Sequence, residues 1–309
     1  MSTTLLRKPG ASDFALLVLL GTLWSLTYIA VKWAMLGLPP LSISGSRAAV
    51  ALGLLAGIVA VTRDRMPRGY RTWALIALNG FLTGVVPFVL ISVAARHIGA
   101  GTISVLIGTQ ALWAMILVHL FAGDERITWR KATGMTIGFL GIVVLVGGDA
   151  LRGLGDNVLA QLAVVGAALA WAAGNVVARF IPGDTTPLAR STAVVAAGAT
   201  MAVPLALIVD QPWTLDPTPA AYGGVLLLGS ATAASFIVFM RLVSTVGVNF
   251  VAWANFASPP LGLTLGALLL GEHISLAVIA CLAFLLAGMG VTYWPLLRPS
   301  RLYRPGSSH

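Results

Sequence analysis

The sequence predicts an all-α polytopic membrane protein: ten transmembrane helices arranged as two inverted five-helix repeats, with both termini in the cytoplasm. Three observations support this prediction. Of the 309 residues, 58% are hydrophobic and only 9% are charged, whereas about a quarter of the residues in a soluble domain are charged. Apolar runs long enough to cross a bilayer follow one another along almost the whole chain. Landmarks of the first half of the sequence also recur in the second half.

The apolar runs are separated by short segments rich in Arg, Asp, Gly and Pro. Each run is continuous, and it does not alternate between apolar and polar residues as the strands of an outer-membrane barrel do. We therefore expect one helix over each run and no separate soluble domain. The expected helices cover residues 13–35, 43–62, 72–95, 102–123, 132–148, 157–178, 188–209, 221–240, 249–271 and 275–294.

The distribution of positive charge predicts the orientation, because Lys and Arg are enriched in cytoplasmic loops. With the N-terminus inside, all of the 19 Lys and Arg residues fall on the cytoplasmic side except Lys32, Arg47, Arg96 and Arg152. Both termini are then cytoplasmic, and residues 295–309 form a cytoplasmic tail. The net charge of +9 is concentrated in short loops, which is the pattern of membrane orientation, so we expect no nucleic-acid partner.

An internal repeat is visible at an offset of 147 residues. Trp24 and Lys32 in "WSLTYIAVK" match Trp171 and Arg179 in "WAAGNVVAR". The same offset carries further landmarks: Pro40 onto Pro187, Glu125 onto Glu272, and Gly141 onto Gly288. The chain is therefore predicted to be a duplicated unit, with one repeat over residues 13–148 and the other over residues 157–294.

Each repeat holds five expected helices, which is an odd number. The second repeat must therefore cross the membrane in the direction opposite to the first. Inverted repeats of this kind are the architecture of secondary transporters, whose substrate site lies near the bilayer midplane where the two repeats meet.

The ordered motifs resemble the drug/metabolite transporter superfamily, specifically its tandem EamA-type members of ten helices. The resemblance rests on the repeated tryptophan and basic residue, on "PPLSISGSR" with Arg47, and on the half-closing segments "GDERITWRKATGMTIGFLGIVVL" and "GEHISLAVIACLAFLLAGMGV". Members usually carry a proline in the fourth helix of each half. Here the second half has Pro259 and Pro260 and the first half has none, and Val194 stands opposite Arg47.

The chain is similar to YddG-type amino-acid exporters, and this resemblance implies export of amino acids or related metabolites across the inner membrane. A transporter of another small solute, such as a drug-like cation or a sugar derivative, and a channel-like facilitator are alternatives. The sequence has no HExxH, no GxSxG and no pair of intramembrane aspartates, so we expect no enzyme. We also expect no metal and no other cofactor, a small-molecule substrate, a lipid bilayer as the surroundings, and a monomer.

Candidate site residues are the large or polar side chains at mid-span. None of the ten carboxylates lies near the centre of an expected span, and no cation does either. This pattern favours neutral or zwitterionic solutes, because amides and hydroxyls both donate and accept hydrogen bonds. The alternative is that these groups bond across helices in ordinary packing. The substrate-binding candidates are Trp24, Tyr28, Asn79, Thr83, Gln110, Trp113, Trp171, Asn175, Ser235, Trp253, Asn255 and Ser258.

Gate or mouth candidates lie nearer the ends of the spans. Lys32 and Arg179 are related by the repeat, so they are expected at opposite mouths of one cavity, either as snorkelling anchors or as gates. Pro259 and Pro260 are expected to bend or break the ninth helix. Glu125 and Glu272 end symmetric helices, and we expect them to cap and to form ion pairs. Proton coupling and uniport both remain open.

Overall fold

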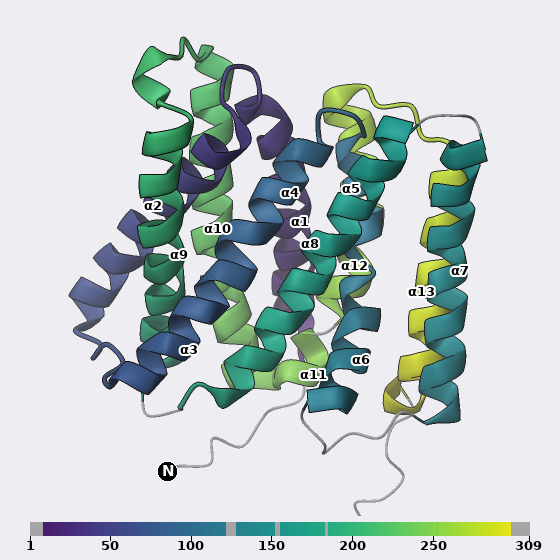
Figure 1. Cartoon of the computed structure of the whole chain (residues 1–309). Helices are drawn as coiled ribbons and strands as arrows, with labels where there is room; N and C mark the ends of the chain where they lie inside the picture. Colours follow the sequence, from purple (N-terminus) through teal and green to yellow (C-terminus); the bar gives the residue numbers. More distant parts are fainter. Residues whose placement is uncertain (1–8, 122–127, 152–154, 183–184, 252, 298–309) are drawn as a thin grey trace, which may run out of the picture.

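The structure is a computed structural model that describes residues 9–121, 128–151, 155–182, 185–251 and 253–297 (Figure 1). Within these residues it is a bundle of helices. They are α1 (Ala11–Ala34), α2 (Pro40–Thr62), α3 (Tyr70–Gly80), η1 (Phe81–Val85), α4 (Val86–Ala94), α5 (Ala100–Ile107), α6 (Gln110–Phe121), α7 (Trp129–Leu151), α8 (Gly155–Phe180), α9 (Pro187–Val209), η2 (Pro212–Thr214), α10 (Pro219–Val246), α11 (Val248–Val251), α12 (Ala254–Leu270) and α13 (Leu276–Leu297).

Every expected apolar run is helical over most of the residues that the structure describes. Among those residues, seven stretches are long and apolar enough to cross a membrane, and three shorter apolar helices accompany them at Ala132–Leu145, Ala257–Leu270 and Leu276–Val291. The helical membrane fold is confirmed. The crossing of the bilayer by all ten runs, and the cytoplasmic position of the termini, stay predictions.

Local signals explain where several helices begin and end. Prolines occupy the first position of α2, α9 and α10, where the missing N–H costs no intrahelical bond. Thr186 and Thr218 precede two of these prolines, and their hydroxyls accept hydrogen bonds from Ala189 and Ala221. Gly271 ends α12 with φ 64°, a left-handed conformation that glycine adopts without steric cost.

The helices pair in a pattern that is unchanged when the two halves are exchanged. Helix α2 packs against α9, and α7 packs against α13. Helix α1 packs against α10 and α12, while its counterpart α8 packs against the α3–α4 span and against α6. Figure 1 shows α1 and α8 running in opposite directions, and α13 ending at the end of the bundle where α1 begins. This arrangement is what inverted repeats produce.

The pair α7 and α13 lies at one side of the bundle (Figure 1). This contact is close at Gly141 of α7 and at its repeat counterpart, Gly288 of α13. Each glycine lies against the helix that contains the other glycine. A Cβ on Gly141 would lie 2.8 Å from the Cβ of Phe284 in α13, and one on Gly288 would lie 2.9 Å from the backbone nitrogen of Gly138 in α7. Both positions therefore require the absence of a side chain.

Three spans are interrupted within their length. The third contains the π-helical segment η1, the fourth is broken between α5 and α6, and the ninth is divided into α11 and α12. The expected interruption of the ninth helix is present, but it comes before Pro259 and Pro260, which lie inside α12. The largest buried apolar cluster of the described residues includes residues of α1, α4, α5 and α8.

Candidate functional site

The site begins with a break in hydrogen bonding at η1. The N–H of Val86 bonds to the carbonyl of Phe81, one residue farther back than in an α-helix, and π-helical turns of this kind are frequent at functional sites. Pro87 follows and has no N–H, so the carbonyl of Thr83 loses its α-helical donor. That carbonyl instead accepts a hydrogen bond from the indole N–H of Trp171, at 2.8 Å.

A second hydrogen bond joins the same two spans. The amide nitrogen of Asn79 donates to the carbonyl of Gly174 over 2.6 Å, and this contact is buried. The hydroxyl of Thr83 bonds back to the carbonyl of Asn79 at 2.8 Å. A Cβ on Gly174 would collide with the methyl group of Thr83. Two residues of the first half, Asn79 and Thr83, are therefore fixed directly against α8 of the second half.

Arg47 was not among the candidate site residues of the sequence analysis, and the structure places it beside this region. It was expected on the outer side, and no cation was expected at mid-span. The outer side stays a prediction, but the structure corrects the second expectation: Arg47 is the eighth residue of α2 and is only 3% exposed, so a buried cation does lie within the second span. Its Nη2 donates to the carbonyl of Gly84 over 2.6 Å. Its guanidinium carbon lies 3.6 Å from the centroid of the Phe88 ring, a cation–π distance.

Aromatic rings link Arg47 to the two hydrogen bonds that join the first half to the second half. Phe88 meets Trp171 edge to face, with ring centroids 5.7 Å apart. Tyr28 is 4% exposed and belongs to the same buried cluster as Phe88. We call Arg47, Asn79, Thr83, Phe88 and Trp171 the central cluster. It combines a cation, an amide, a hydroxyl and an aromatic wall where both halves meet.

Ser258 lies outside the central cluster, in a contact of three helices. The hydroxyl of Ser25 in α1 donates to the carbonyl of Ser258 in α12 at 2.9 Å, and the hydroxyl of Ser104 in α5 donates to the same carbonyl at 3.2 Å. Gly262 permits this approach, because a Cβ there would collide with Ser104. This is the packing arrangement that small and hydroxyl residues make in membrane proteins.

The remaining binding candidates occupy several different places. Trp24 packs on an apolar cluster of α1, α10 and α11. Trp113 meets Phe139 edge to face at 5.1 Å. Ser235 bonds to the carbonyl of Thr232 in its own helix. Half-buried positions are held by Gln110 and Asn255, and exposed positions by Asn175 and Trp253.

The mouth candidates lie near the two ends of the bundle. Lys32, in the last turn of α1, is half-buried, and the negative charge of Glu272 acts on its ammonium group. Glu272 accepts hydrogen bonds from the backbone N–H groups of Ala100 and Gly101 at 2.6 and 2.9 Å, so it caps the start of α5 as expected. Arg179 is exposed near the end of α8. Glu125 lies outside the described residues.

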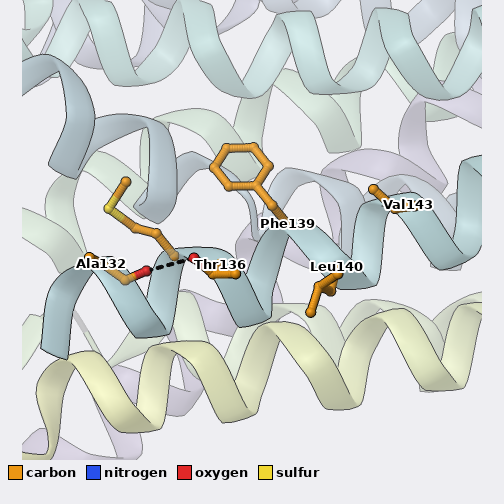
Figure 2. A pocket seen from close by; sticks show the side chains of 6 residues that line it. Ala132, Thr136, Phe139, Leu140 and Val143 are labelled. Atoms are coloured by element: carbon orange, nitrogen blue, oxygen red, sulfur yellow. Dashed lines mark hydrogen bonds between the residues drawn. The ribbon is translucent and has the colours of Figure 1, made fainter. Parts of the chain in front are cut away.

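A groove runs along α7 (Figure 2), and none of its lining residues belongs to the central cluster. Its lining is apolar apart from Thr136, whose hydroxyl donates to the carbonyl of Ala132 in its own helix. The groove therefore offers few free polar groups to a polar solute. Among the described residues, no group of three His, Cys, Asp or Glu side chains is placed to hold a metal ion.

The two halves match one protein family. Residues 13–147 and residues 158–294 each match the EamA-like transporter family. The chain belongs to this family. As an EamA-like transporter it is a multi-pass protein of the inner membrane that acts on a small-molecule substrate.

Two relatives of this EamA-like transporter are similar over most of their length. A "Probable terminal-alkyne amino-acid exporter" of Streptantibioticus cattleyicolor is 28% identical, over 83% of this chain and 84% of the relative. A "Probable amino-acid metabolite efflux pump" of Escherichia coli is 25% identical, over 85% and 88%. One crystal structure at 17% identity superposes with a TM-score of 0.64 over 94% of this chain and 99% of its own, which shows a shared fold.

Proposed function

We propose that this EamA-like transporter is a secondary transporter that exports amino acids or related small metabolites across the inner membrane by alternating access. The observation that carries the proposal is the central cluster. There a broken helix of the first half is hydrogen-bonded to α8 of the second half through Trp171 and Asn79. Discontinuous helices at the meeting of inverted repeats are where secondary transporters bind their substrates.

The chemistry of the cluster suits an amino acid. The π-helical turn and Pro87 leave the carbonyl of Thr83 without its backbone donor, and its second lone pair can accept a further hydrogen bond beside the one from Trp171. Carbonyls of broken helices coordinate cations in secondary transporters. Trp171 and Phe88 provide apolar faces for a side chain. Tyr28 makes no hydrogen bond within the part of the chain that the structure describes, so its hydroxyl is available to a solute. We therefore propose Tyr28, Asn79, Thr83 and Trp171 as the centre of the binding site.

The ends of the bundle supply the two gates of alternating access. At one end Glu272 ties α5 of the first half to the segment after α12 of the second half. Opening that end separates the halves there and breaks these charge-assisted bonds, which are stronger than neutral ones. Lys32 lies at the end of the bundle where Glu272 makes these bonds. Arg179 is the repeat counterpart of Lys32, so we propose that Arg179 belongs to the gate at the opposite end.

The names of two relatives also support the substrate class, since one is called an amino-acid exporter and the other an amino-acid metabolite efflux pump. Transport, without catalysis, is then the whole activity. We propose a monomer, because each chain already contains both repeats. We also propose that the protein has no nucleic-acid partner, because its positive charge is concentrated in short loops between the spans.

Counterflow in liposomes tests the proposal. Purified protein is reconstituted, the liposomes are loaded with one unlabelled amino acid at a time, and uptake of the labelled amino acid is measured with and without a proton gradient. We expect saturable counterflow for a subset of the panel. Equal traces for protein-containing and empty liposomes across the whole panel would refute amino-acid transport.

A further inference from the structure

Arg47 is a buried cation whose hydrogen-bonding capacity is largely unused. A guanidinium carries five N–H donors, and within the described residues Arg47 makes one hydrogen bond, from Nη2 to Gly84. Its Nε is buried and has no partner. No ion pair to Arg47 is present in the described part of the chain, and the carboxylates described there lie toward the ends of the bundle.

Burial of the Arg47 guanidinium costs free energy unless a further group pairs with its charge. A charge removed from water loses far more solvation energy than one neutral carbonyl and one ring face return. Ionisable groups inside membrane spans are for this reason usually functional. A planar carboxylate fits the unused edge of the guanidinium, where it accepts two parallel N–H hydrogen bonds.

We propose that Arg47 is the receptor for a carboxylate group of the transported solute. This inference rests on the proposed transport function and deepens it by specifying the substrate class. Phe88 positions the guanidinium from one side, and Gly84 holds it through Nη2, so that Nε faces the solute. The same positive charge disfavours drug-like cations, which were an alternative substrate class.

The backbone is closely packed on one side of Arg47. Gly84 lies against Gly198 of α9, and a Cβ on Gly80 would lie 2.6 Å from the carbonyl of Val194. The first half therefore meets α9 backbone to backbone beside the guanidinium. Val194 is the repeat counterpart of Arg47, so the proposed receptor exists on one side of the pseudo-symmetric site, and it gives the bound solute one orientation.

A purely structural role is the competing explanation. Arg47 ties α2 to the broken third span through Gly84, and its loss would then weaken the fold for every substrate alike. The two roles differ in one measurable property. A carboxylate receptor discriminates between an acid and the corresponding neutral amide, whereas a structural tie does not.

The first experiment uses the wild-type protein in detergent. Its thermal unfolding is measured with 3-phenylpropionate and with 3-phenylpropionamide, which differ in the carboxylate alone. We expect a concentration-dependent rise in melting temperature with the acid and none with the amide. An equal response, or no response, to both compounds overturns the inference, whether or not amino acids are transported.

The second experiment compares Arg47→Gln and Arg47→Lys with the exposed Arg96→Gln as a matched control. The acid-specific stabilisation should disappear in Arg47→Gln and be partly kept in Arg47→Lys. Counterflow of leucine should fall about tenfold or more in Arg47→Gln, as expected for loss of a charge-assisted pair, and inhibition by leucinamide should be unchanged. An equal loss of leucine counterflow and of inhibition by leucinamide in folded protein shows a structural tie and leaves the proposed transport function standing.

Discussion

Trp171 donates its indole N–H to the carbonyl of Thr83 over 2.8 Å, and this bond joins the halves of the transporter where the third span is broken. The acceptor is free because Pro87, four residues later, has no N–H. Both halves contribute to this contact. Pro87 of the first half leaves the carbonyl of Thr83 without its backbone donor, and Trp171 of the second half donates to that carbonyl instead.

We predict that Trp171→Phe keeps most of the apolar contact and removes this bond. The carbonyl of Thr83 is then left without a donor, which should cost about 1–2 kcal/mol of stability and lower the transport rate. Thermal unfolding in detergent and initial counterflow rates measure both effects. Trp213→Phe is the control, since Trp213 is 69% exposed in η2. Identical behaviour of the two variants would contradict the prediction.

Glu272→Gln should weaken the cap of α5. The substitution removes the negative charge from two hydrogen bonds to the backbone N–H groups of Ala100 and Gly101, and also its interaction with the helix dipole. We expect a loss of about 1–2 kcal/mol, seen as a lower melting temperature. Asp216→Asn serves as the control, because Asp216 is exposed in the segment before α10. A shift no larger than that of the control would exclude a capping role.

Gly262→Ala should disrupt the contact of α1, α5 and α12, because the new Cβ collides with Ser104. Overpacking of this kind costs about 1–3 kcal/mol. Adding Ser104→Gly removes the colliding atoms and should restore part of the stability. Gly53→Ala is the control, since no atom lies within 4 Å of a Cβ there. Failure of the second substitution to recover any stability would show that the collision is not the cause.

Replacing Pro259 and Pro260 together by alanine should slow transport in protein of normal abundance. Two prolines in succession remove two helical hydrogen bonds from α12, so alanines allow a straighter and stiffer helix. Pro259 also faces the break in the fourth span, where a Cβ on Gly108 would lie 3.2 Å from it. Pro204→Ala in α9 is the matched control. An unchanged rate in the double variant would show that bending of α12 has no part in transport.

Labelling of single cysteines tests the orientation. Cys281 is the one cysteine of the chain and is buried, so the native background needs no removal. We expect a membrane-impermeant maleimide, added outside intact cells, to label Asp216→Cys strongly and Arg65→Cys weakly. Both should react equally after the cells are permeabilised. Strong labelling of position 65 in intact cells would reverse the predicted orientation.

The sequence predicted the helices well because continuous apolar runs and punctuating loops are local properties. The repeat was visible through Trp24 with Trp171 and Glu125 with Glu272, and each half matches the same family model. It could not predict which face of a helix points inward. Lipid is as apolar as the protein interior, so a membrane helix needs no polar face to mark its exposed side. Asn175, one turn after Trp171, was expected beside it in the cavity and lies on an exposed face.

The interruptions of the spans were harder still to predict. Pro87 was visible in the sequence, but the carbonyl that it leaves without a backbone donor is bonded by Trp171, which lies in another part of the chain. The fourth span breaks after Ile107 with no proline at all. Arg47 was misplaced because the second span was expected to begin at residue 43. It begins at Pro40, which places Arg47 about two turns inside the helix.

The reciprocal placement of Gly141 and Gly288 gives the contact between α7 and α13 an internal symmetry. A residue and its repeat counterpart each lie against the helix that contains the other, as the same residue does in two identical subunits related by a two-fold axis. Within one chain, this contact therefore has the geometry of a two-fold subunit interface. The symmetry does not extend to every residue, because Val194 is the counterpart of Arg47.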